Sequence, residues 1–162
     1  MPKTLSTLFC AGLLCAGAAW AGTVEVRYEQ PERFSDVGPR RDADAVQQQL
    51  TGIFDALAAR QLPASQVLRI VVTDVDLAGE IPPGAVRLHD VRVMGRHPDW
   101  PRITLRYSLQ DGGRVLTEGS EVVSDMAYLS RSTQASGSGA LPYERRMLAD
   151  WFDKRFGRAA SH

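Results

Sequence analysis

The sequence contains little cysteine, and none in the part expected to fold. Cys10 and Cys15 are its only cysteines, and both lie within the first 21 residues, which resemble a leader peptide. Once that leader is removed, the chain has no thiol. We therefore expect no disulfides, no thiol catalysis and no cysteine-ligated metal in the folded protein.

Long hydrophobic runs are also missing, because a membrane-spanning helix takes about 20 apolar residues and no segment reaches that length. Residues 5–19 form an uncharged run rich in Leu and Ala that follows Lys3, and Ala19-Trp20-Ala21 comes next. This pattern is typical of a secretory signal peptide cleaved before Gly22. We expect a cleaved signal over residues 1–21, a single domain over 22–157 and a frayed tail over 158–162. The mature protein should be exported, and periplasmic in a Gram-negative bacterium, with no integral membrane segment.

An excess of charge of one sign is absent as well. The 19 basic residues equal the 19 acidic residues, and removal of Lys3 leaves 18 basic residues against 19 acidic ones. This balance gives no support for a nucleic-acid or anionic-membrane partner. Outward-facing arginines at Arg27, Arg102 and Arg106 form, at most, a small patch for an acidic partner.

Hydrophobic periodicity predicts an α+β fold. Alternation predicts a strand at residues 23–28, a period of 3.6 predicts a helix from Asp42 to Pro63, and residues 66–77 read as a buried strand. A weaker strand at 86–94 precedes two strands at 102–110 and 114–123, and a helix follows at 142–157. The order β-α-β-β-β-β-α predicts a two-layer sandwich, with a mixed, mostly antiparallel sheet of about five strands and two helices on one face.

The sequence Asp-Gly-Gly at residues 111–113 is a strong hairpin signal. With the two glycines at the tip, Leu109 is expected to face Leu116, and Ile103 to face Val122. That register places apolar residues opposite apolar residues.

The stretch TDVDLAGE, residues 73–80, places Asp74 and Asp76 two positions apart at the end of the buried strand. Residues i and i+2 of a strand share a face. The pair is therefore expected on the same face as Val72, where the strand changes from apolar to acidic. The structural interpretation is salt bridging to Arg87 or Arg92 on the next strand, or simple solvation.

Two chemical interpretations of this pair remain open. Carboxylates at this spacing suit Ca²⁺ or Mg²⁺, and His89 beside Asp90 offers further ligands or a zinc-binding nitrogen. Two close carboxylates can also act as an acid–base pair. The candidate metal ligands are Asp74, Asp76, Asp90 and His89.

Four aromatic residues are candidates to line a ligand groove: Trp100, Tyr107, Tyr128 and Trp151. Core packing explains Tyr107 and Trp151 more simply. No G-x-S-x-G turn is present, and we assign no catalytic residue.

Five stretches together resemble the bacterial family known as domain of unknown function 3016: FSDV, TDVDLAGE, WPRITLRYSL, SDMAYL and LPYERRMLADWF. The stretches lie between Phe34 and Phe152, and the resemblance as a whole covers the chain from Val24 to about Phe156. The resemblance implies an exported bacterial protein made essentially of this one domain, and it brings no activity.

The absence of a catalytic constellation favours a small, soluble, non-enzymatic binding or envelope-assembly module without a cofactor. Its partner would be an envelope protein or a small ligand. The alternative is a divalent-metal-binding protein or a metal-dependent hydrolase that uses Asp74 and Asp76.

Overall fold

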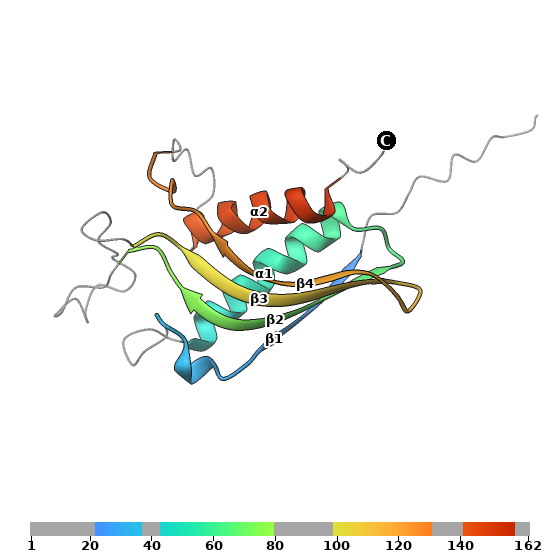
Figure 1. Ribbon diagram of the computed structural model, residues 1–162, viewed down its shortest axis with the longest axis horizontal. Helices are drawn as coiled ribbons and strands as arrows, with labels where there is room; N and C mark the ends of the chain where they lie inside the picture. The colour runs from blue at the N-terminus through green and yellow to red at the C-terminus, as the bar shows by residue number, and fades with distance from the viewer. Residues whose placement is uncertain (1–21, 37–42, 80–98, 131–140, 158–162) are drawn as a thin grey trace, which may run out of the picture.

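The computed structural model describes residues 22–36, 43–79, 99–130 and 141–157 (Figure 1). Its elements are, in chain order, strand β1 Thr23–Tyr28, 3-10 helix η1 Pro31–Arg33, helix α1 Ala43–Gln61, strand β2 Gln66–Asp76, strand β3 Arg102–Asp111, strand β4 Arg114–Ser124 and helix α2 Pro142–Phe156.

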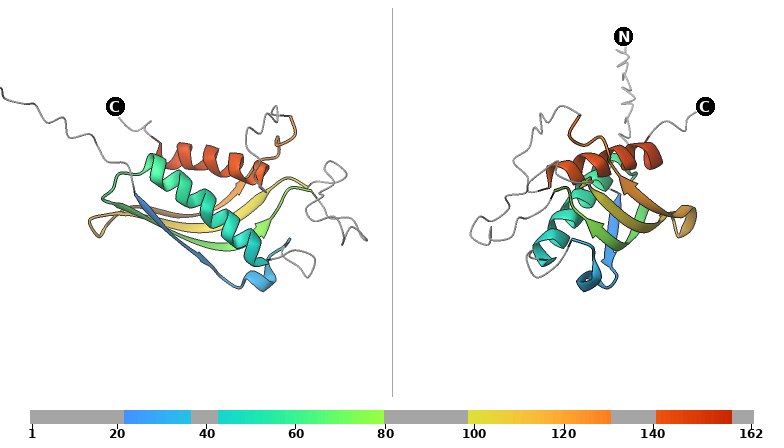
Figure 2. Two further views of the ribbon diagram at one scale, coloured as in Figure 1. Left: turned by 180° about the vertical axis from the view of Figure 1, so that it is seen from behind. Right: turned by 60° about the vertical axis from the view of Figure 1, so that its left-hand side comes forward.

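The strands form one mixed sheet in the order β1-β2-β3-β4. β1 and β2 are parallel, as the helical crossover between them requires, and the other neighbours are antiparallel. Figure 2 shows both helices on the same face of the sheet, and no described helix covers the other face, called the open face below. The predicted two-layer α+β fold is confirmed with four strands among the described residues; the strand expected at 86–94 lies outside them.

The core lies between the sheet and the two helices. Trp151 of α2 connects an aromatic cluster in this core, in edge-to-face contact with Phe54 of α1 at 6.5 Å, Tyr107 of β3 at 5.7 Å and Phe156 at 5.4 Å between ring centroids. Burial of each such large apolar side chain stabilises the fold by roughly 1.5–3 kcal/mol. The largest apolar side chains with almost no exposed surface are Leu50, Phe54, Leu62, Leu68, Ile70, Val72, Leu77, Ile103, Leu105, Leu148 and Phe152.

A β-bulge in β2 changes the expected direction of the acidic pair. Val72 pairs with Leu105, but Asp74 pairs with Thr104, so the register shifts by one residue between them. Beyond this point Val75 joins Val72 in the core. The prediction that the aspartates continue the face of Val72 was therefore wrong, because one extra residue reverses the alternation of side chains.

The β3–β4 hairpin is confirmed, but its predicted register is not. Gly112 and Gly113 have φ values of 55° and 86°, which a two-residue turn of this kind needs. A second register shift follows at Leu109, which pairs with Thr117 instead of Leu116. Ile103 accordingly pairs with Val123, whereas Val122 is exposed.

Candidate binding site at the edge of the sheet

The acidic pair at the end of β2 is engaged by protein donors. Asp74 accepts the backbone N–H of Ser35 at 2.8 Å through Oδ1 and the Ser35 hydroxyl at 3.0 Å through Oδ2. Arg102 on β3 lies 2.6 Å from Asp76 Oδ2. Asp36 continues the same arrangement by accepting the Leu77 N–H at 3.2 Å. These contacts attach the segment after η1 to the end of β2.

The geometry gives the metal hypothesis little support. The candidate ligands His89 and Asp90 lie outside the described residues. Within the described ranges, no three His, Cys, Asp or Glu side chains come together in a group that could hold a metal ion. Asp74 is held by hydrogen bonds from Ser35, and Asp76 by its ion pair with Arg102. Arg87 and Arg92, the ion-pair partners expected from the sequence, lie outside the described residues, and a metal site there stays a prediction.

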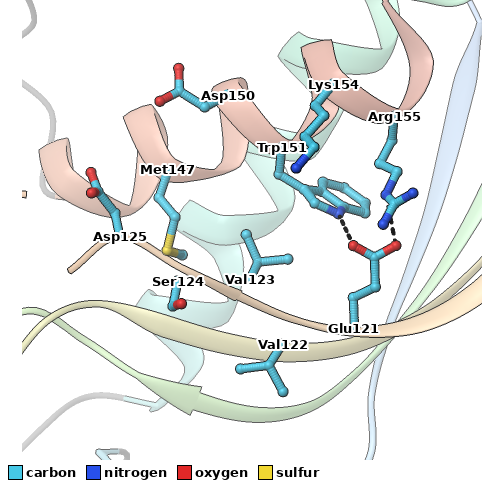
Figure 3. Close-up of a pocket in the computed structure, with 10 residues that line it drawn as sticks. All are labelled: Glu121, Val122, Val123, Ser124, Asp125, Met147, Asp150, Trp151, Lys154 and Arg155. Atoms are coloured by element: carbon cyan, nitrogen blue, oxygen red, sulfur yellow. Dashed lines mark hydrogen bonds and ion pairs between the residues drawn. The ribbon is translucent and has the colours of Figure 1, made fainter. Parts of the chain in front are cut away.

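A second region presents an open groove between β4 and α2 (Figure 3). Its volume is about 300 Å³. The strand side is formed by Glu121, Val122, Val123, Ser124 and Asp125, and the helix side by Met147, Asp150, Trp151, Lys154 and Arg155. Side chains of the helix recur on one face because residues three and four apart lie above one another.

Glu121 joins the two walls of this groove. Its carboxylate accepts the indole N–H of Trp151 at 3.1 Å and pairs with Arg155 Nε at 2.8 Å (Figure 3). Burial disfavours the charged form, but hydrogen bonds from Trp151, Tyr107 and Arg155 and the charge of Arg155 outweigh it and hold the pKa of Glu121 below its usual range. The ionised carboxylate therefore fixes α2 beside β4.

A buried carboxylate at the other end of α2 completes this attachment. Glu144, in the first turn of α2, has no exposed surface and accepts the Ala78 N–H at 2.9 Å. Nearby, Arg146 donates to the Tyr128 carbonyl at 2.7 Å and lies 3.6 Å from Asp125. The sequence places Glu144 in the first turn of a helix, where a negative charge is favourable. It does not reveal the attachment to Ala78, because the burial of Glu144 depends on the end of β2.

β4 is an edge strand whose outer side has no partner strand in the described part of the chain. It is 11 residues long and contains neither proline nor lysine, which commonly protect such edges. Three of its apolar side chains are exposed: Val115 by 47%, Leu116 by 41% and Val122 by 59%. Figure 3 shows Val122 directed away from α2, on the opposite side of the strand from Val123.

The open face of the sheet, in contrast, is largely neutralised by its own ion pairs. Arg69 lies 3.0 Å from Glu25, and Arg106 pairs with Glu29. Since Arg102 pairs with Asp76, two of the three arginines proposed for an acidic partner already have carboxylate partners. Among the described strands, the exposed large apolar side chains lie on β4.

Sequence reasoning predicts Trp151 and Tyr107 as core residues and does not identify β4 as a site. One feature of the sequence does indicate an edge strand: no further strand pattern follows the second strand of the hairpin before the last helix. Its position at the edge depends on the order of strands in the sheet, which one sequence does not specify.

Comparison with known proteins agrees with the resemblance in the sequence. Residues 22–154 match a family model described as "Protein of unknown function (DUF3016)". No curated protein and no solved structure matches the chain. Among the described residues, no helix has the length and apolar character needed to cross a membrane.

Proposed function

Because the chain belongs to the DUF3016 family, whose description names no activity, we propose a function from its surfaces. It is an exported, non-enzymatic binding module of the bacterial envelope that takes up an extended polypeptide segment along β4. The observation that carries this proposal is the outer edge of β4, which no described strand pairs with, beside the groove of α2.

Strand addition uses both features of this site. An extended segment placed beside β4 hydrogen-bonds to its outward N–H and C=O groups, which supply affinity without regard to sequence. Successive side chains of that segment point alternately to the two faces of the sheet. One set enters the groove next to Met147 and Lys154, and the other lies beside Val122 on the open face.

The groove is held ready for such a segment by contacts at both ends of α2. Glu121 ties the strand to Trp151 and Arg155, and Glu144 ties the first turn of the helix to Ala78. A preformed groove lowers the ordering cost of association.

Export is supported by the N-terminal pattern of Lys3, the apolar residues 5–19 and the small residues before Gly22. Fractionation of the producing cells, with mass spectrometry of the N-terminus, tests it. A periplasmic chain that begins at Gly22 supports export, and a cytoplasmic chain that keeps residues 1–21 contradicts it.

The metal-dependent alternative has less support, because Asp74 and Asp76 are bound by Ser35 and Arg102. Their contacts account for both carboxylates without an added cation.

Site-specific photo-crosslinking tests the binding function. A photoreactive residue at Val122 in the producing cell should give a discrete adduct with a polypeptide, and Leu116→Lys should remove that adduct. The same residue at Ala59, exposed on α1, is the matched control. Equal adducts at both positions, or none at Val122, would contradict strand addition at β4.

A further inference from the structure

We infer that the strand received by the β4 edge is β4 of a second copy of this chain, paired antiparallel about a two-fold axis at Gly119. The inference rests on the proposed function, since it names the partner for the same edge. The result is one continuous sheet across two copies, with the helices of both on the same side.

The register of β3 and β4 defines which side chains meet in this pairing. From Thr117 to Ser124 the pairing with β3 is regular, and Val123 and Glu121 share the inner face with Ile103 and Leu105. The even-numbered residues of this segment therefore face outward, and Val122 is 59% exposed there. In an antiparallel pair joined in one sheet, outward residues meet outward residues.

An axis at Gly119 makes the outward residues complementary. Leu116, the extra residue that the register shift inserts between Val115 and Thr117, is opposite Val122 of the second copy by position along the strand, and the same contact occurs twice by symmetry. Glu118 lies opposite Ser120, so no two charges of the same sign are directly opposed. Leu116 and Val122, two of the three exposed apolar side chains of β4, are 41% and 59% accessible in the single chain and come together in this register.

Neighbouring axes are less favourable. An axis at Glu118 places this carboxylate opposite its own copy, and an axis at Glu121 does the same with that residue; like charges directly opposite are destabilising. An axis at Ser120 places Glu118 against Val122, which removes the apolar pairing. Charge and apolar matching therefore select Gly119.

In the same register, the side chains of the second copy that point to the helix-covered face of the sheet fit the groove. Gly119 meets Gly119 at the axis, and Thr117 of the second copy lies opposite Glu121. A threonine and a glycine are small enough for a groove of about 300 Å³, and Glu121 is already paired with Arg155. No unpaired carboxylate has to enter the groove.

Sedimentation over a dilution series of residues 22–162, which contain every described element, tests the inference. We expect a monomer–dimer equilibrium. Because each contact occurs twice, Val122→Lys should raise the dimer dissociation constant about tenfold, and Leu116→Lys should do the same. Leu129→Lys, another exposed apolar site outside β4, is the matched control and should leave it unchanged.

Disulfide trapping tests the register independently, because residues 22–162 contain no cysteine. Directly opposed residues lie about 4.5–5.5 Å apart between Cα atoms, within the range of a disulfide. A mixture of Glu118→Cys and Ser120→Cys chains should form the mixed disulfide faster than either chain alone forms its own.

A chain that stays monomeric at all concentrations, or a dimer unaffected by both lysine variants, would overturn the inference. Equal trapping in all mixtures would overturn the register. The proposed function is separable from both: a monomeric chain that still gives a Val122 adduct with another polypeptide disproves only the identity of the partner, and the absence of any adduct disproves the strand-binding function itself.

Discussion

Gly119→Ala should destabilise the protein, although most glycine-to-alanine changes in a strand favour folding. Gly119 pairs with Tyr107 across the β3–β4 ladder, and a Cβ at this position would lie 2.9 Å from the Tyr107 hydroxyl and 3.0 Å from two ring carbons. The ring cannot move freely, because Trp151 and Phe156 each lie 5.7 Å from it, centroid to centroid.

Two opposing effects decide the sign. Overpacking of this kind costs about 1–3 kcal/mol, whereas the loss of glycine's freedom in the unfolded chain favours folding by about 0.4–1 kcal/mol. We therefore expect a net decrease of about 1–2 kcal/mol in the free energy of unfolding.

Urea titration of the variant and its parent measures this difference. The matched control is Gly52→Ala in the middle of α1, where an added Cβ meets no atom within 4 Å. Since alanine is the better helix former, this change should raise the free energy of unfolding by about 0.5–1 kcal/mol. A Gly119→Ala protein as stable as its parent would refute the close packing of Tyr107 on the edge strand.

Three further predictions concern titratable groups. Replacement of Asp74 and Asp76 together by Asn should lower the free energy of unfolding by about 1–2 kcal/mol. The melting temperature of the parent should be the same with chelator and with Ca²⁺, Mg²⁺, Mn²⁺ or Zn²⁺. A melting temperature that depends on a cation in the parent but not in the double variant would support the metal hypothesis. The pKa of Glu121 is lower in the folded protein than in the unfolded chain. The Glu121 carboxylate therefore stabilises the fold at a pH above its pKa in the unfolded chain, and this stabilisation is lost as the pH falls through its pKa in the folded protein. Glu121→Gln should consequently be less stable than its parent at neutral pH, with a difference that narrows in acid unfolding measurements; a constant difference would contradict this. Burial, together with the negative charge of Asp55, raises the pKa of Tyr28 to about 12 despite the opposing hydrogen bond with Thr51. The neutral Tyr28 phenol therefore contributes fully to stability below the pKa of tyrosine in the unfolded chain, and this contribution is lost as the pH rises toward 12. Ultraviolet titration should show a phenol ionisation near pH 12 that is absent from the Tyr28→Phe variant.

Much of the fold follows from periodicity. The alternation in residues 23–28 and 102–110, the helical stripe before Pro63 and the Asp-Gly-Gly turn each identify their element, because each pattern reflects one face buried and one face in water. A helix between two neighbouring strands then requires that they be parallel, as β1 and β2 are.

The errors come from single extra residues in strands. The bulge after Val72 turns Val75 inward and pairs Asp74 with Thr104, so that the Asp74 side chain binds Ser35; a similar shift beside Leu109 leaves Leu116 exposed. The two bulges lie in the stretches TDVD and RVLT, and neither stretch contains a glycine that would indicate a bulge. Alternation by itself therefore predicts a strand correctly but assigns its residues beyond the bulge to the wrong face.

The candidate site is harder to predict, because it depends on contacts between distant segments. Glu144 reads as an ordinary helix-start residue until Ala78 lies beside it, and Glu121 reads as an outward residue of a hairpin until Trp151 and Arg155 pack over β4. These pairs are separated by 30 residues or more along the chain.

Residue-resolved amide hydrogen exchange along β4 tests the central claim most directly, since strand addition occupies backbone groups and not only side chains. The exchange rates would be compared between dilute, monomeric protein and protein associated with its partner strand. Strand addition predicts that alternate amides from Thr117 to Ser124 become protected on association, while the amides of β1 at the other edge of the sheet do not change. Association without any protection in β4, or with protection confined to β1, would contradict it.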